Sequence, residues 1–262
     1  FHIRISGLPE FACELPSTVM AEETLTEGEG QIRALITTAG NPVLSAPNGQ
    51  QMDEALSGLD FMVCLDFYIN ETTQHADIIL PPTSALEHDH YDLAFHRLAV
   101  HNTARFNEPV FQPAPGALHD WEIFNGLGLA IAARKGIELK PLPSPDKLID
   151  MGIQRGPYSA AAGHPLALTL DKIKQHPHGI DIGRLEPSLP ERICTHDGQI
   201  QLLADYLRQD IARLENTPAA TDKDELLLIG RRHIRSNNSW MHNAHRLVKG
   251  KPRWQLLMHP DD

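Results

Sequence analysis

The chain has 262 residues, enough for one large domain or two ordinary ones. Its hydrophobic fraction of 41% allows a sizeable core, and its net charge of -11 argues against nucleic acid or an anionic membrane surface as a partner. No apolar run reaches the roughly 18 residues that a membrane-spanning helix needs. The three cysteines form no C-x-x-C pair, so we expect no iron–sulfur cluster or structural zinc within this chain.

The chain begins with Phe1, which is not a translation start, so we expect a piece of a longer polypeptide. For the same reason, the lack of a leader peptide does not argue against export. The odd cysteine count favours a reducing compartment, and a cytoplasmic location is therefore expected, with the periplasm left open. Cys64 lies within an apolar run and is expected to be a buried thiol.

The N-terminal part has the pattern of an open α/β sheet. A helix is expected over 17–28, and residues 52–58 have the apolar spacing of a second one. Short apolar runs at 34–38, 61–65 and 77–80 predict strands. Because strand, crossover helix and strand form the parallel unit of such sheets, we expect ligands at the carboxyl ends of these strands.

The middle of the chain is predicted to begin with a long connection over 83–119. It should contain a polar turn at 87–91 and a short strand at 98–100. Asp120 then opens the clearest helix, which Gly136 ends. The predicted apolar stripe of this helix consists of Trp121, Phe124, Leu127 and Ile131.

The remainder is less periodic. Short helices are expected near 146–153 and 170–175, within loop-rich surroundings. Residues 201–214 predict an amphipathic helix, and 218–224 read as a polar linker. The run 226–229 is predicted to be a buried strand.

The loop Gly40-Asn41-Pro42 supports two interpretations. Gly40 can adopt a positive φ and admit a ligand to the backbone, while loop N–H groups and a following helix N-terminus suit a phosphate. Ser45 adds a hydroxyl. Alternatively, Asn-Pro is simply a good turn. Spacing alone favours neither interpretation.

Two carboxylates follow these elements, Asp66 at a strand end and Asp120 at a helix start. A carboxylate has only acceptors, so it can receive both N–H donors of a guanine edge. The alternative for Asp66 is a cap on the next turn. The alternative for Asp120 is a helix N-cap, and the bare sequence favours that cap.

His88 and His90 flank Asp89 and follow Glu87, which raises the question of a metal site. The 15 histidines are scattered through the chain, and no predicted strand or helix fixes the geometry of this group, so no metal site is predicted. We find no nucleophile elbow, phosphate-binding P-loop or Ser/His/Asp set, and therefore assign no catalytic residue.

A second polar stretch, 231–243, follows the apolar run 226–229. It is dense in donors, and its Arg side chains match phosphate geometry. Since loops after strands often carry function, we expect this stretch to bind a ligand.

Together these stretches resemble the molybdopterin oxidoreductases, the family of formate dehydrogenases, nitrate reductases and dimethyl sulfoxide reductase. The string Ala-Asp-Ile-Ile-Leu-Pro-Pro at 76–82, with Asp66 upstream and Glu87 downstream, is its most specific part. The resemblance covers most of 31–135 and 225–245. The other similar segments are 32–35 with Gly40-Asn41-Pro42, 63–72, His119-Asp120-Trp121, and 230–239 with Met241.

The resemblance implies a doubly wound, mostly parallel, Rossmann-like α/β domain over 1–220 and the truncated start of a β-barrel domain over 221–262. It implies bis-molybdopterin guanine dinucleotide (bis-MGD) with molybdenum as the cofactor of the full-length parent. Asp120 is similar to the family's guanine-reading Asp, which reverses the preference for a cap. The residues implied along one cofactor arm are Gly40, Asn41, Ser45, Asp66, Thr72 and Pro82, and those near the pterin are Arg231, Asn237, Ser239 and Met241.

The chain departs from the family in lacking the cluster cysteines and any segment with a molybdenum ligand, so the iron–sulfur cluster is expected elsewhere in the parent. We expect the rest of the polypeptide, a redox protein and a small-molecule substrate as partners, with formate dehydrogenase-like activity favoured over nitrate reductase-like activity. The alternatives are a cofactor-free relative, such as the large iron–sulfur subunit of complex I, and a module that binds guanine nucleotides.

Overall fold

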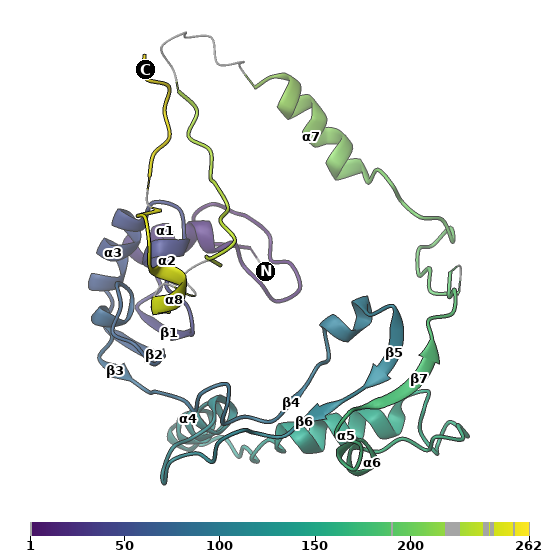
Figure 1. Cartoon of the computed structure of the whole chain (residues 1–262). Helices are drawn as coiled ribbons and strands as arrows, with labels where there is room; N and C mark the ends of the chain where they lie inside the picture. The colour runs from purple at the N-terminus through teal and green to yellow at the C-terminus, as the bar shows by residue number, and fades with distance from the viewer. Residues whose placement is uncertain are drawn as a thin grey trace.

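The computed structural model describes residues 2–189, 191–217, 226–237, 241, 244–253 and 255–261, without the side chains of Arg97 and Tyr206. Its organising element is a three-stranded parallel sheet of β1 (Ala34–Thr38), β2 (Phe61–Leu65) and β3 (Ile78–Ile79) in the order β1-β2-β3 (Figure 1). All five residues of β1 pair with β2, and β3 pairs with the middle of β2. The predicted parallel α/β unit is therefore confirmed.

Three helices cover one face of this sheet: α1 (Met20–Leu25), which follows the 3-10 turn η1 (Ser17–Val19), α2 (Pro42–Ser45) and α3 (Gly49–Ser57). The predicted apolar spacing of α3 is seen in its buried residues, which pack against Met62 and Cys64 of β2. Gly49 permits this packing, because a Cβ there would lie 2.3 Å from the carbonyl oxygen of Val43. Gly58 ends the helix as predicted, with its N–H bonded to carbonyls of the last turn.

Helix α4 (Asp120–Arg134) covers the other face of β2. Its buried Ile123 packs with Val63 and Leu65. The predicted stripe is partly wrong, since Phe124 and Ile131 are 43% and 50% exposed. The inward face is set by Ile123 and Leu127, because β2 and Leu80, the residue after β3, pack against that side of the helix.

A second cluster lies below the sheet in Figure 1 and joins two antiparallel pairs with two helices. The pairs are β4 (His90–Tyr91) with β6 (Phe106–Asn107) and β5 (His101–Ala104) with β7 (Ile180–Arg184). Helices α5 (Pro145–Arg155) and α6 (Leu170–Lys174) form as predicted, and buried Ile173 packs in this cluster.

The strand predicted at 98–100 is wrong. Residues Phe95–Leu98 form the 3-10 turn η3, and the strand begins later, at His101. The strand pairs with β7, which lies about 80 residues further along the chain and which the loop-rich composition of 155–200 concealed.

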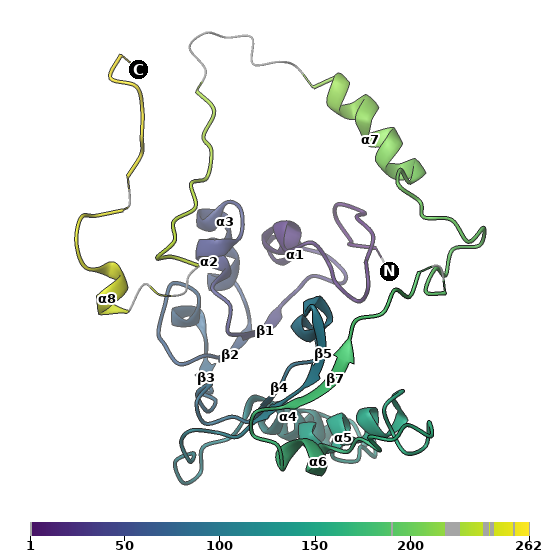
Figure 2. The ribbon, with the colours of Figure 1, turned by 45° about the vertical axis from the view of Figure 1, so that its right-hand side comes forward.

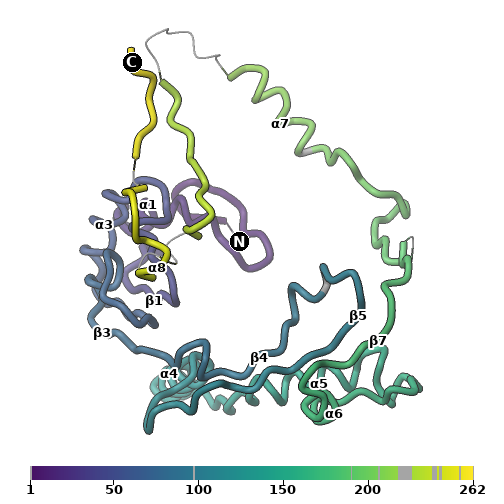
Figure 3. Tube along the Cα trace, in the orientation of Figure 1, coloured from purple at the N-terminus to yellow at the C-terminus, as the bar shows by residue number. Residues whose placement is uncertain are grey.

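Beyond β7 the chain becomes extended, and Figures 2 and 3 show α7 (Asp205–Glu215) standing well away from the sheet. Helix α8 (His245–Val248) is a single turn. The predicted buried strand at 226–229 is wrong: these residues have no strand assignment, and their side chains are 61% to 86% exposed. The predicted linker 218–224 lies outside the described residues, and the domain division stays a prediction.

Within the described ranges, no helix is both long and apolar enough to cross a membrane. The structure thus supports a mixed α/β chain. The larger doubly wound sheet and the start of a barrel stay predictions.

Candidate functional site

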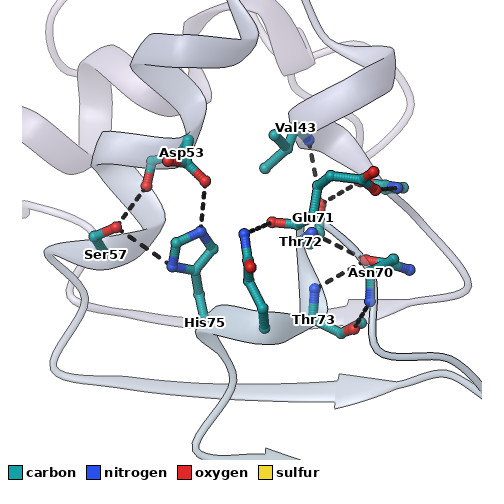
Figure 4. Close-up of polar contacts among 10 residues, drawn as sticks. Val43, Asp53, Ser57, Asn70, Glu71, Thr72, Thr73 and His75 are labelled. Carbon is teal, nitrogen blue, oxygen red and sulfur yellow. Dashed lines mark hydrogen bonds and ion pairs between the residues drawn. The ribbon is translucent and has the colours of Figure 1, made fainter.

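The candidate site lies where the parallel strands end. The loop after β1 carries Asn41, and the loop after β2 carries Thr72, which is 0% exposed. The Thr72 hydroxyl donates to Asn41 Oδ1 at 2.7 Å and accepts from the Val43 N–H at 3.2 Å (Figure 4). Because both contacts use the same hydroxyl, Thr72 holds the two loops together and orients the Asn41 amide.

The Asn41 amide is polarised from its other end as well. Its Nδ2 donates to Glu71 Oε2 at 2.9 Å, and this hydrogen bond holds the pKa of Glu71 below its usual value. One N–H of the amide is left over after these contacts. Asn41 is therefore a fixed donor at the sheet edge.

Asp66, immediately after β2, organises its own loop. Its Oδ1 accepts from the N–H groups of Phe67 at 2.6 Å and Tyr68 at 3.2 Å, while Asn70 Nδ2 lies 3.4 Å from Oδ2. Asn70 Oδ1 in turn accepts from the Thr72 N–H at 2.9 Å. These contacts are those of the cap that the sequence offered as the alternative for Asp66.

The backbone strain after β1 falls one residue earlier than expected. Ala39 has φ 49°, whereas Gly40 is not among the residues with positive φ, and a Cβ at Gly40 would meet only ordinary contacts. Ser45 donates its hydroxyl to the Asn41 carbonyl at 2.9 Å. Helix α2 has four residues, too short for the phosphate-binding helix N-terminus that the sequence suggested.

The turn η2 (Thr73–His75) anchors the second loop to α3. His75 Nε2 lies 2.7 Å from Asp53 Oδ1, and its Nδ1 lies 3.3 Å from Ser57 Oγ (Figure 4). The Ser57 hydroxyl donates to the Asp53 carbonyl oxygen at 2.8 Å. Because the Ser57 hydroxyl proton is donated to a carbonyl, its oxygen can only accept from His75. The contacts of His75 with Asp53 and Ser57 thus anchor the loop to the helix.

Asp120 is the first residue of α4 and not its N-cap, so the bare-sequence preference for a cap is wrong. His119 occupies the cap position, and Glu122 Oε2 accepts from the His119 N–H at 2.8 Å. The Asp120 side chain has a buried oxygen, Oδ1, without a hydrogen-bond partner among the described residues. A buried acceptor of this kind is costly unless something donates to it.

Packing places Asp120 close to the strand ends. Ile123, one turn along α4, contacts Leu65, the residue before Asp66, and Leu80 also packs there. The Thr83 N–H donates to the Leu118 carbonyl at 3.0 Å, which joins the Pro81-Pro82 loop to the start of the helix. Half-buried Pro82 is thus adjacent to this junction.

Two histidines that the sequence did not assign lie at the same junction. The Thr83 hydroxyl is 2.5 Å from both His88 Nε2 and His119 Nδ1, and the two rings meet edge to face with centroids 4.9 Å apart. Glu87 accepts from the Ser84 N–H at 2.7 Å, and this bond is the main cause of its lowered pKa. The sequence had indicated His88 only as part of a possible metal group and His119 only as part of the family resemblance, while the capping pattern completed by Glu122, three residues after His119, was a further signal.

Among the residues that the structure describes, no group of three or more His, Cys, Asp and Glu side chains could hold a metal ion. His88 is engaged by Thr83, as described above. The predicted buried thiol, Cys64, is 0% exposed, and burial raises its pKa, while the Thr37 hydroxyl that donates to its sulfur opposes this.

The described residues that the sequence assigned in the second polar stretch are exposed. Arg231 and Asn237 are exposed, Met241 is 42% exposed, and Ser239 lies outside the described residues. Figure 1 shows residues 226–237 as an extended segment that rises above the sheet. The structure therefore brings together the predicted residues of the three strand-end loops and α4, whereas Arg231, Asn237 and Met241 are exposed on a separate segment.

A family comparison matches residues 14–129 to the molybdopterin oxidoreductase domain. The chain is 34% identical over 122 residues to the assimilatory nitrate reductase catalytic subunit of Bacillus subtilis, a match that covers 45% of this chain and 16% of that protein. It is 31% identical over 108 residues to the F420-dependent formate dehydrogenase subunit alpha of Methanocaldococcus jannaschii, covering 40% and 15% respectively.

A longer match is to the probable oxidoreductase YoaE of Bacillus subtilis, 26% identical over 224 residues, or 84% of this chain and 31% of that protein. The chain thus spans less than a third of these relatives. The family match includes the three strands and the first part of α4, which are the elements that build the candidate site.

Proposed function

We propose that the chain is part of a molybdenum oxidoreductase and supplies part of a bis-MGD site, because residues 14–129 match the molybdopterin oxidoreductase family. The family implies an oxidoreductase parent and a molybdopterin cofactor. We further propose that this cofactor has the guanine dinucleotide form. The reaction of the parent and the residues of the site are likewise proposed below.

The observation that carries the proposal is the unpartnered Asp120 Oδ1, buried at the junction of α4 and the strand ends. A guanine base presents an N–H and an exocyclic amine side by side, and an ionised carboxylate can accept from both. The donor that Asp120 lacks is therefore the kind that guanine has. The chemistry of Asp120 therefore fits a cofactor that carries guanine.

The other strand-end residues have supporting roles in the proposed site. Asn41 offers its remaining amide N–H, while Thr72 orients that amide and Asp66 holds the shape of the second loop. Gly40, Ser45 and Pro82 are proposed to line the cofactor at the same edge. When bound, the cofactor would supply two-electron redox chemistry, and these residues would bind and orient it.

The remaining parts of the proposal concern the parent protein. Arg231, Asn237, Ser239 and Met241 are proposed to contact the pterin side in the complete protein. Formate dehydrogenase-like activity is preferred to nitrate reductase-like activity, and relatives of both names match this chain. We further propose that the parent contains an iron–sulfur cluster outside this chain and is located in the cytoplasm. Its proposed partners are a redox protein and a small-molecule substrate.

Two alternative functions make different predictions. A cofactor-free relative would contain neither molybdenum nor guanine, and its Asp120 would be a relic. A module for guanine nucleotides would bind GMP without molybdenum. The metal and guanine content of the full-length parent, purified without oxygen, separates these alternatives, and about two guanines per molybdenum are expected for a site that sandwiches the metal.

The residue-level test is Asp120→Asn in the full-length parent. The amide replaces one acceptor oxygen by an N–H₂ group that opposes the guanine donors, so released GMP per folded polypeptide should fall about tenfold, as for loss of a charge-assisted hydrogen bond. Asp205→Asn is the matched control, since Asp205 is the first residue of α7 and lies away from the sheet. Unchanged GMP in Asp120→Asn would refute the assignment.

A further inference from the structure

The junction beside Asp120 contains one hydroxyl shared by two imidazoles. Thr83 is 3% exposed, and its Oγ1 lies 2.5 Å from a nitrogen of each ring. The three side chains come from separate segments: the loop after β3, the following turn and the cap of α4. The hydroxyl is therefore the point where these segments are hydrogen-bonded together.

Proton counting couples the two rings. A threonine hydroxyl has one proton, so with neutral imidazoles it donates to one ring nitrogen and accepts from an N–H of the other. If it donates to His119 Nδ1, then His88 must carry its proton on Nε2. If it donates to His88 Nε2, then His119 must carry its proton on Nδ1. Each arrangement fixes both tautomers, and neither ring can change its tautomer alone without losing a hydrogen bond.

These hydrogen bonds also fix the backbone next to Asp120. His119 directly precedes Asp120, and its N–H is held by Glu122 while its ring is held by Thr83. The Thr83 N–H is bonded to the Leu118 carbonyl one residue earlier. The peptide before Asp120 is thus fixed by side-chain and backbone contacts to the same threonine, so the carboxylate has a defined position at the helix start.

We propose that Thr83, through its shared hydrogen bonds to His88 and His119, is the positioning residue that holds the Asp120 carboxylate for its guanine ligand. This inference rests on the proposed function and adds a specificity device to the same site. Its physical basis is that bidentate recognition depends on both distance and angle, so a small displacement of the helix start weakens both bonds.

The test compares variants of the full-length parent by GMP released per folded polypeptide. Thr83→Val keeps the side-chain shape and removes the hydroxyl, whereas Thr83→Ser keeps the hydroxyl. We expect about tenfold less GMP in Thr83→Val and recovery in Thr83→Ser, the scale of a lost positioning hydrogen bond. Thr24→Val is the control, because Thr24 is also buried, at 6% exposure, and donates to the Met20 carbonyl of α1.

The readout separates positioning from stability, since Thr24→Val should lower the unfolding temperature without changing the GMP content of the folded protein. Full GMP content in Thr83→Val would overturn the inference while leaving the proposed function intact. Absence of GMP from the unmodified protein would overturn the proposed function itself. If Thr83→Val does not fold, His88→Phe against His88→Gln repeats the test, because Phe retains the ring contact and Gln retains a hydrogen-bonding group.

Discussion

The sheet and the C-terminal arm, by which we mean the described residues from 226 onward, both contain short apolar runs, but the run in β2 is buried and the run in the arm is not. In β2, Met62 and Cys64 are 0% exposed, because strands flank β2 on both edges and helices cover both faces. Residues 226–229 are at least as apolar, yet they are 61% to 86% exposed and pair with no strand among the described residues. An apolar run shows that its burial would be favourable, but it is buried only where adjacent strands and helices cover it.

The strongest test of this contrast substitutes the same residue type in both regions. Met62→Ala should lower the free energy of unfolding by about 2–5 kcal/mol, because it leaves a cavity between β2 and the α1–α3 layer. Met258→Ala, at a residue that is 49% exposed, should change it by less than about 0.5 kcal/mol. Urea denaturation followed by circular dichroism measures both. Equal effects would contradict the division into a packed sheet and a loosely covered arm.

The next test concerns polar contacts of the sheet edge. Thr72→Val removes the hydroxyl that joins Asn41 and the Val43 N–H, and should lower the free energy of unfolding by about 1–3 kcal/mol, since both partners lose a partly buried hydrogen bond. Thr38→Val at an exposed position of β1 is the matched control and should be nearly neutral. Faster hydrogen exchange at the Val43 amide in Thr72→Val alone would locate the effect. An unchanged exchange rate would show that the loops do not depend on Thr72.

A smaller effect is expected from pH. Burial raises the pKa of Cys64 in the folded state above its value in the unfolded chain, about 8.5. The folded state then retains a proton that the unfolded state loses, so this contribution is complete below about pH 8.5 and declines as the pH rises towards the folded-state pKa. The decline is at most about 1.4 kcal/mol per pH unit for one group.

Two cysteine variants isolate this contribution. The stability of Cys64→Ala should vary less between pH 8 and pH 10 than that of Cys194→Ala, because Cys194 is exposed. The same proteins provide a chemical check, since Cys13 and Cys194 should react quickly with a thiol reagent and Cys64 only on unfolding. Parallel pH profiles for the two variants would exclude Cys64 as the source.

The sequence was sufficient to predict an element where the apolar pattern and the element that covers it lie close together in the chain. Strands β1 and β2 and helix α3 were predictable because one crossover unit supplies both the apolar faces and the surfaces that cover them. The inward side of α4 was not, because β2 and Leu80, which follows β3, determine it from some 40 to 60 residues away. The pairing of β5 with β7 was missed for the same reason.

The site shows the same limit. Proximity of Asn41 and Asp66 could be anticipated from strand ends meeting at one edge. The roles could not, because they depend on which donors each side chain meets: Asp66 is satisfied by its own loop, while Asp120 Oδ1 is left without a partner. Thr83 carried no signal in the sequence, since a hydroxyl between two imidazoles requires three segments to converge.

The smallest effect is expected in α7, which forms a helix as predicted but whose apolar side chains are exposed. Leu207 and Ile211 are 47% and 45% exposed, so Leu207→Gln should change the free energy of unfolding of this chain by less than about 0.5 kcal/mol. Leu170→Gln in α6, at 3% exposure, is the matched substitution and should be strongly destabilising, because it places an unpaired amide in the second cluster. If Leu207→Gln were equally costly in urea denaturation, α7 would have to pack against the remainder of the chain in solution, and the contrast between the two regions would fail at that helix.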